Sequence, residues 1–149
     1  MTEFENFLSP GRKGHLIGIG RESISSQAKV LTGMGLNITG SDMNESSNVL
    51  NLRKKGIPVA IGHNAENITD DVEFVVRTAA VHDENPEIQA AHAKGTPVFE
   101  RTQAWGAISK DYDNALCICG THGKTTTTSM CTHIMMAADK DPTVMIGGT

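Results

Sequence analysis

The chain has 149 residues, of which 38% are hydrophobic and 20% charged, with a formal net charge of −4 at pH 7. This balance is typical of a globular protein of one domain, or of one domain and part of a second. It disfavours nucleic-acid binding, which needs clustered Lys and Arg to neutralise phosphates. The sequence has no apolar run long enough to span a bilayer, and its N-terminus is acidic. We therefore expect a cytoplasmic protein with no membrane partner.

The first part of the chain has the pattern of a βαβ unit. Residues 1–13 predict an irregular lead-in, residues 15–20 a strand that runs into Gly18 and Gly20, and residues 21–31 a helix. The second strand, 36–40, is followed by Asp42, about twenty positions after Gly20, where dinucleotide-binding folds place a carboxylate for ribose hydroxyls. The G-x-G-x-x-G fingerprint is incomplete because Ser23 stands at its third glycine.

Strands and helices then continue to alternate. We expect helices over 46–55, 85–94 and 101–109, and strands over 58–61, 74–76 and 96–99. The third strand ends at His63, and the fourth leads into the small residues Thr78, Ala79 and Ala80, beside which a flat base can lie. Trp105 is interpreted as a packing residue. The alternation predicts an α/β, Rossmann-like parallel sheet with helices on both faces.

A polar stretch at 110–114 marks a domain boundary, after which the pattern restarts. Residues 115–119 predict a buried strand that points Cys117 and Cys119 into a core, and residues 143–146 a further strand. Between them lies a turn with Gly120 and Gly123, followed by a helix that Thr125 opens. The glycines let main-chain N–H groups close on an anion, and Lys124 adds a mobile charge. This turn is a predicted phosphate cradle.

The cradle meets the general P-loop pattern only in its second half, because Ile118 stands where the first glycine belongs. Its sequence, Gly-Thr-His-Gly-Lys-Thr-Thr-Thr-Thr from residue 120, resembles the ATP loop of the Mur ligases, the ATP-dependent enzymes of peptidoglycan precursor assembly. The upstream motifs resemble the branch of that family that joins L-alanine to UDP-N-acetylmuramate. They are residues 15–20, 40–42, 62–63, 78–80 and 85–87, in the family's order and approximate spacing.

The resemblance implies a division of labour along the chain. Residues 14–113 would bind UDP-N-acetylmuramate, and residues 114–149 would begin an ATP-binding domain that is truncated here, so we expect the chain alone to be inactive. The implied UDP-sugar residues are Gly18, Gly20, Arg21, Ser23, Asp42, His63, Thr78 and Ala79. The implied ATP residues are Gly120, Thr121, His122, Gly123, Lys124, Thr125 and Thr126, with Lys124 catalytic and Thr125 on Mg²⁺.

Two positions depart from the family pattern, and other functions stay open. Arg21 stands where the family has a glycine facing the diphosphate, and Arg77 stands where it has an uncharged residue. His63 is equally compatible with a surface turn. The alternative functions are a sister ligase that attaches a recycled peptide to the same sugar nucleotide, and a non-catalytic NAD-binding Rossmann module. The second leaves the phosphate loop unexplained.

Overall fold

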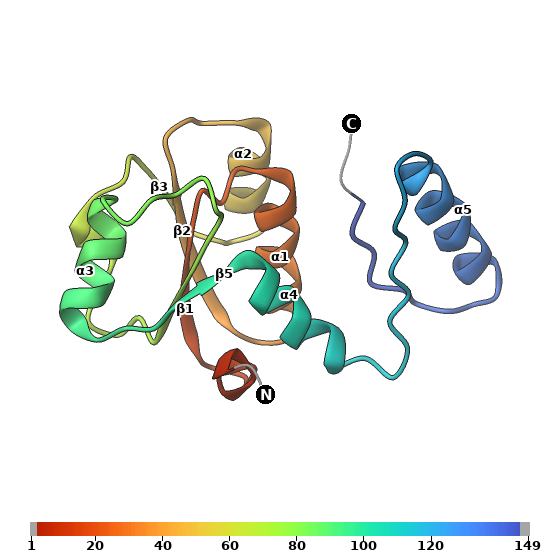
Figure 1. Cartoon of the computed structure of the whole chain (residues 1–149), viewed down its shortest axis with the longest axis horizontal. Helices are drawn as coiled ribbons and strands as arrows, with labels where there is room; N and C mark the ends of the chain where they lie inside the picture. The colour runs from red at the N-terminus through yellow and green to blue at the C-terminus, as the bar shows by residue number, and fades with distance from the viewer. Residues whose placement is uncertain (1–2, 147–149) are drawn as a thin grey trace. The chain divides into compact units, whose positions relative to one another are not determined.

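The computed structural model describes residues 3–146, and the chain divides between Asp111 and Tyr112 into two compact units (Figure 1). The first unit contains a five-stranded parallel sheet of order β3-β2-β1-β4-β5. Its strands are β1 Lys13–Ile17, β2 Asn37–Asp42, β3 Val59–Ile61, β4 Phe74–Arg77 and β5 Val98–Glu100. Its helices are η1 Glu3–Phe7, α1 Glu22–Gly33, α2 Ser47–Lys54, η2 Ala65–Asn67, α3 Pro86–Lys94 and α4 Arg101–Lys110. The predicted α/β class and parallel sheet are confirmed, and the ends of these elements lie within three residues of the predicted ones.

Both faces of the sheet are covered. Leu16 of β1 joins a large cluster with side chains of α1, α2 and α4, whereas its neighbour Ile17 joins a second cluster with Ile88 and Ala91 of α3. Successive residues of a strand point to opposite faces, so a strand buried on both sides needs a continuous apolar run. Figure 1 shows α3 on one side of the sheet and α1, α2 and α4 on the other.

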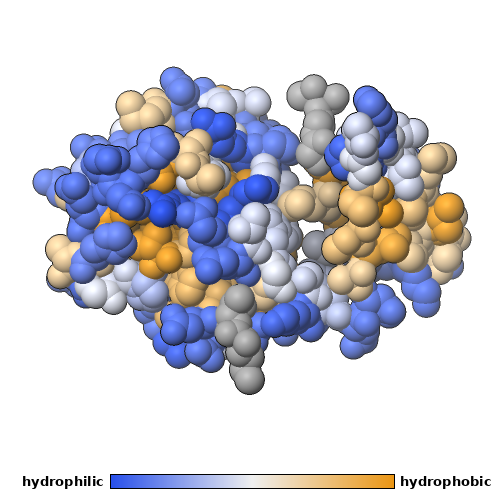
Figure 2. All heavy atoms as spheres, viewed as in Figure 1, coloured by the Kyte–Doolittle hydropathy of each residue, from blue (hydrophilic) through white to orange (hydrophobic). Residues whose placement is uncertain are grey.

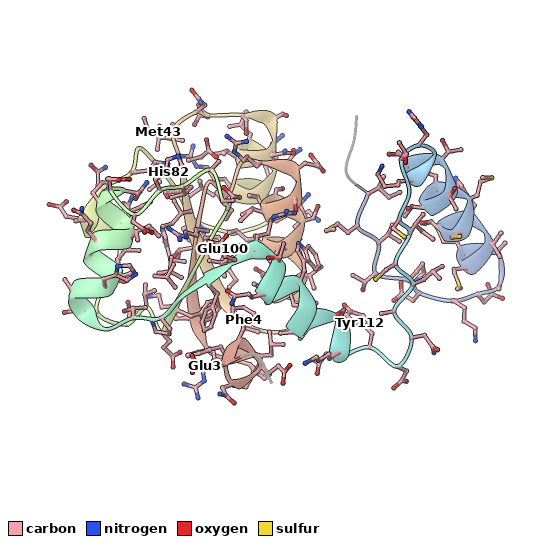
Figure 3. The ribbon with its side chains drawn as sticks, in the orientation of Figure 1. Glu3, Phe4, Met43, His82, Glu100 and Tyr112 are labelled. Carbon is pink, nitrogen blue, oxygen red and sulfur yellow. The ribbon has the colours of Figure 1, made fainter. Side chains whose placement is uncertain are left out.

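The prediction of an irregular lead-in is wrong for part of residues 1–13. Residues 3–7 form the 3₁₀ helix η1, and Lys13 already belongs to β1. Phe4, labelled in Figure 3, is fully buried. Its ring meets Phe74 edge-on at 5.2 Å and Phe99 at 5.0 Å between centroids. Aromatic pairs at this spacing add to the free energy of burial. The segment therefore belongs to the hydrophobic core and packs against β4 and β5.

Trp105 lies on α4 and packs, partly buried, against the large cluster, as a packing residue should. Residues 111–114, which follow α4 and span the division between the two units, are exposed. The polar stretch at this position thus coincides with the division between the units.

The second unit has one regular element among its described residues, α5 Lys124–Ala137. The predicted strands at 115–119 and 143–146 are wrong, and Cys117 and Cys119 are exposed rather than packed in a core. A strand needs a neighbour to pair its N–H and C=O groups, and all strand pairs among residues 3–146 lie within the first unit. The apolar run at 115–119 has no such neighbour in the described structure.

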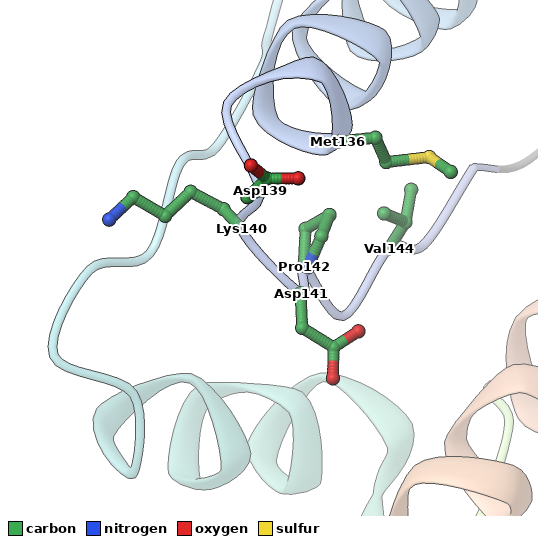
Figure 4. A pocket seen from close by; sticks show the side chains of 6 residues that line it. All are labelled: Met136, Asp139, Lys140, Asp141, Pro142 and Val144. Carbon is green, nitrogen blue, oxygen red and sulfur yellow. The ribbon is translucent and has the colours of Figure 1, made fainter.

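The second unit exposes several large apolar side chains of α5. Met130, Ile134 and Met136 of α5 are each more than half exposed, and Figure 2 shows apolar residues gathered on this unit. A hollow of about 390 Å³ follows the helix; its lining is Met136, Asp139, Lys140, Asp141, Pro142 and Val144 (Figure 4). None of the predicted site residues lines it.

Candidate functional site

The strand order reverses between β1 and β4, which makes their carboxyl ends a topological switch point. The chain leaves β1 through Gly18–Arg21 toward α1 on one face, and leaves β4 through Thr78–Val81 toward α3 on the other. A Cβ atom on Gly18, whose φ is +77°, would lie 3.9 Å from Cγ2 of Val81. Open α/β sheets bind ligands in the crevice at this point. The structure thus brings together the turns that carry predicted Gly18, Gly20, Arg21, Thr78 and Ala79.

The Gly18–Arg21 turn is fixed by β2. The N–H groups of Gly18 and Ile19 both donate to the carbonyl of Ser41, at 2.8 and 3.0 Å. Asp42 accepts from the N–H of Gly20 through Oδ2 at 2.9 Å and from the N–H of Asn44 through Oδ1 at 3.0 Å. The carboxylate predicted to bind ribose therefore also holds the turn, and each of its oxygens retains capacity for one more donor.

Gly20 is needed for its lack of a side chain. A Cβ atom there would lie 2.9 Å from both Oδ2 of Asp42 and Oγ of Ser46, and 3.0 Å from Cγ2 of Val49. Ser46 caps α2 by accepting from the N–H of Val49. The turn after β1 thus packs directly against Asp42 and the start of α2, as the glycine-rich turn of a nucleotide-binding fold does.

The start of α1 is open to an anion. Its N-cap is Arg21, which is exposed and makes no capping hydrogen bond through its side chain. The first N–H groups of a helix lack intrahelical acceptors and attract negative charge. Ser23, the second predicted residue of this turn, instead contacts the guanidinium of Arg101 and ties α1 to α4.

Arg77, the last residue of β4, holds the turn after this strand through hydrogen bonds. Its guanidinium donates to the carbonyl of Val81 at 3.2 Å and to Oε1 of Glu100 at 2.9 Å, and pairs with Asp83. Its hydrogen bond to Asp83 and then that to Glu100 raise the pKa of Arg77. The hydroxyl of Thr78 is buried and has no hydrogen-bond partner in the described structure, while Ala79 is exposed. A buried hydroxyl without a partner is costly, so a ligand polar atom here would be stabilising.

His63 lies in a polar cluster that the sequence did not reveal. Its Nδ1 is 2.8 Å from Oε2 of Glu87 and 3.1 Å from Oγ of Ser41. Glu87 of α3 is fully buried, and further contacts reach it from Ser41 at 2.7 Å, Asn67 at 2.6 Å and His15 at 3.3 Å. His63 thus lies in the turn after β3, but its side chain is only 16% exposed and is held by Glu87 and Ser41.

Glu87 is ionised despite its burial. Burial opposes the charged form, but hydrogen bonds from His15, Asn67 and Ser41 outweigh it and hold the pKa of this carboxyl below its usual value. The motif Asn85-Pro86-Glu87 predicts only a helix start, which Asn85 caps by accepting from the N–H of Glu87 at 2.9 Å. Acidic residues in a first helical turn are common and usually solvated, so no local signal distinguishes this one.

The predicted phosphate loop lies in the second unit. Gly120 and Gly123 have φ of +155° and +78°, and Gly123 is the N-cap of α5, which no side chain caps. The Lys124 ammonium donates to the carbonyls of Gly120 at 2.6 Å and Thr121 at 3.3 Å. His122, Thr125 and Thr126 are exposed. The loop therefore combines an uncapped helix start with a lysine folded over it.

Residues 3–146 offer neither a cluster of metal-ligating side chains nor a membrane-spanning helix. No group of three or more His, Cys, Asp or Glu side chains is arranged to hold a metal ion. No helix in the same range has the length and apolar character required to cross a bilayer.

Comparisons with known proteins identify relatives of this chain. The family described as "Mur ligase family, catalytic domain" matches residues 13–113. A UDP-N-acetylmuramate–L-alanine ligase of Agathobacter rectalis is 48% identical over 134 residues, which are 90% of this chain and 29% of that protein. The crystal structure of the UDP-N-acetylmuramate–alanine ligase of Thermotoga maritima superposes with a TM-score of 0.85 at 36% identity, over 91% of this chain and 32% of that one.

A more distant structure is the murein peptide ligase of Psychrobacter arcticus, with a TM-score of 0.81 at 25% identity over 87% of this chain. The chain spans about a third or less of the length of these relatives. The family match covers more than half of the chain, in the unit that holds the switch point between β1 and β4. On this evidence the chain belongs to the Mur ligase family.

Proposed function

We propose that residues 14–113 bind UDP-N-acetylmuramate in the crevice between the β1 and β4 turns. The diphosphate lies on the Gly18–Arg21 turn and the open start of α1, the ribose near Asp42, and the uracil beside Thr78 and Ala79. The single observation that carries this proposal is the switch-point geometry, in which two turns with small residues converge below an uncapped helix. The identity of the sugar nucleotide rests on the relatives' names.

We further propose that residues 114–149 supply the phosphate loop of an ATP site. The uncapped start of α5 and the lysine beside it fit a polyphosphate, with Lys124 on the β- and γ-phosphates. Thr125 would hold Mg²⁺ through its hydroxyl, and the metal would neutralise charge during phosphoryl transfer. Lys124 must then exchange its loop carbonyls for phosphate oxygens. The acceptor would be the carboxylate of UDP-N-acetylmuramate, and L-alanine the amine that joins it, in the cytoplasm.

Calorimetric titration of the chain tests the sugar-nucleotide site. We expect UDP-N-acetylmuramate to bind and NAD not to bind, since the fingerprint lacks the third glycine of dinucleotide sites. Binding of NAD with no response to UDP-N-acetylmuramate would instead support the regulatory Rossmann module. The sister ligase is the weaker alternative, because the murein peptide ligase of Psychrobacter arcticus is less similar to this chain than the alanine ligase of Thermotoga maritima.

Arg21→Gly tests the departure from the family pattern. An exposed guanidinium at the helix start can pair with a phosphate, and a hydrogen bond to a charged group contributes about 1.5 to 3 kcal/mol. We expect the variant to bind UDP-N-acetylmuramate about tenfold or more weakly, with a larger loss at low salt. Lys55→Gly, which removes an exposed cation from the end of α2, is the matched control. Tighter binding by Arg21→Gly would mean that Arg21 obstructs the diphosphate.

A further inference from the structure

The polar cluster on Glu87 joins five elements of the first unit. His15 comes from β1, Ser41 from β2, His63 from the loop after β3, Asn67 from η2, and Glu87 from α3. Each carboxylate oxygen of Glu87 has two contacts: Oε1 with His15 and Asn67, and Oε2 with Ser41 and His63. A buried carboxylate with hydrogen-bond partners at both oxygens restricts the positions of the side chains that contact it.

The contacts determine where His63 carries its proton. Ser41 has one hydroxyl proton, which it donates to Oε2 of Glu87 over 2.7 Å. Its oxygen can then only accept from Nδ1 of His63, 3.1 Å away. Glu87 is an ionised acceptor, and it lies 2.8 Å from the same nitrogen. Both contacts of Nδ1 are therefore favourable only when Nδ1 bears the proton.

This arrangement leaves Nε2 of His63 as the ring nitrogen available to a ligand. Nε2 makes no hydrogen bond with any residue in 3–146, and the side chain retains 16% exposure. In the neutral ring, a proton fixed on Nδ1 makes Nε2 an acceptor. The matching ligand group is a donor such as a sugar hydroxyl, rather than a phosphate oxygen, which only accepts.

The cluster adjoins the nucleotide crevice through β2. The carbonyl of Ser41 holds the Gly18–Arg21 turn while its hydroxyl binds Glu87, and the N–H of Gly62 donates to the carbonyl of Asp42 at 2.9 Å. We infer that Glu87 is a positioning residue that fixes His63 with its proton on Nδ1, so that Nε2 accepts a hydrogen bond from a hydroxyl of the bound nucleotide sugar. The ligand step rests on the proposed function; the state of the ring does not.

Long-range ¹H–¹⁵N correlation spectra of the ¹⁵N-labelled chain at pH 8 test the state of the ring directly. The His63 signal is assigned with His63→Gln. We expect the Nδ1-protonated tautomer, which is opposite to the tautomer that histidine side chains prefer in water. Glu87→Gln should shift the ring toward the ordinary Nε2-protonated form, while the exposed neighbour Glu84→Gln should leave it unchanged. A proton on Nε2 in the unaltered chain would overturn the inference without any variant being needed.

Titration with UDP-N-acetylmuramate tests the ligand step. Glu87→Gln and His63→Gln should each weaken binding about five- to tenfold, and the double variant should be no weaker than the single His63 variant, because Glu87 acts through His63. Equal affinity of Glu87→Gln and the unaltered chain would overturn this step. If the unaltered chain binds no sugar nucleotide but His63 carries its proton on Nδ1, the proposed function fails and the positioning role of Glu87 stands.

Discussion

At the scale of single residues, Glu87 should make the free energy of unfolding depend on pH. Its folded pKa is depressed below the ordinary value of 4.5, so its stabilising contribution is present above that value and lost as the pH falls through the folded pKa. We expect Glu87→Gln to lower the free energy of unfolding by about 1 to 3 kcal/mol at pH 7 and by less at pH 3. Urea unfolding at both pH values measures this.

The pKa values of Asp71 and Glu73 are also lowered, by hydrogen bonds to residues 12 and 13. Both residues are present in the unaltered chain and in Glu87→Gln, so their contributions cancel when the two proteins are compared at one pH. An equal loss of stability at pH 7 and pH 3 would mean that Glu87 stabilises the fold through the packing of its side chain and not through its negative charge.

Two glycines should respond to alanine with opposite signs. Gly20→Ala places a Cβ within 2.9 Å of the carboxylate of Asp42 and the hydroxyl of Ser46, so we expect a loss of about 1 to 3 kcal/mol and weaker nucleotide binding. Gly106 lies inside α4 with no atom within 4 Å of a Cβ, so Gly106→Ala should stabilise by about 0.5 to 1 kcal/mol. Thermal unfolding of both variants gives the signs, and destabilisation by Gly106→Ala would contradict the description of α4.

At the scale of elements, η1 is part of the core and not a tail. Phe4 is fully buried between Phe74 and Phe99, so Phe4→Ala should cost about 3 to 5 kcal/mol through lost burial and the cavity left behind. Its exposed neighbour provides the control, Glu3→Ala, which should change stability by less than about 0.5 kcal/mol. Urea unfolding measures the stability of both variants. A fall of less than about 1 kcal/mol in the free energy of unfolding for Phe4→Ala would mean that residues 3–7 are not part of the core.

Helix α5 should exchange its amide hydrogens much faster than α1. None of the 14 residues of α5 is buried, whereas α1 buries Ile24, Ala28 and Leu31 completely. An isolated helix of this length is marginal in water, because most helical stability in proteins comes from packing of one face. Hydrogen exchange followed by mass spectrometry compares the two peptides under the same conditions. Equal protection of 124–137 and 22–33 would show that something covers α5 in solution.

At the scale of the whole molecule, cooperative unfolding should belong to the first unit. Both hydrophobic clusters in residues 3–146 are drawn from the segment between Phe4 and Ile108. A chain that ends at Asp111 should therefore melt within about 2 °C of the 149-residue chain. A chain that ends at Glu100 lacks Ala104, Ala107 and Ile108 of the core and should not fold cooperatively. A large fall in the melting temperature on truncation at Asp111 would show that the second unit stabilises the first.

The sequence by itself determined the class of the first unit and the position of the glycine turn that we propose as its nucleotide site. Apolar runs such as 74–76, helices closed by glycine and short connections are local signals, and in a parallel α/β fold they suffice to place glycine turns at one edge of the sheet. The turn at 120–125 that we propose as a phosphate loop is also a local feature, since it consists of two glycines with positive φ and a helix start. The Mur ligase resemblance depended on the same motifs.

Only the tertiary structure decided which side chains those turns contact. Burial of Phe4 depends on Phe74 and Phe99, far away in the chain, and the strand expected at 115–119 is absent because pairing needs a neighbour that no local pattern guarantees. Glu87 has the sequence signature of an ordinary solvated helix start, yet packing of α3 against the sheet encloses it with two histidines. A carboxylate's burial and partners are set by residues from several elements, so the contact of Glu87 with His63 emerges only from the folded chain.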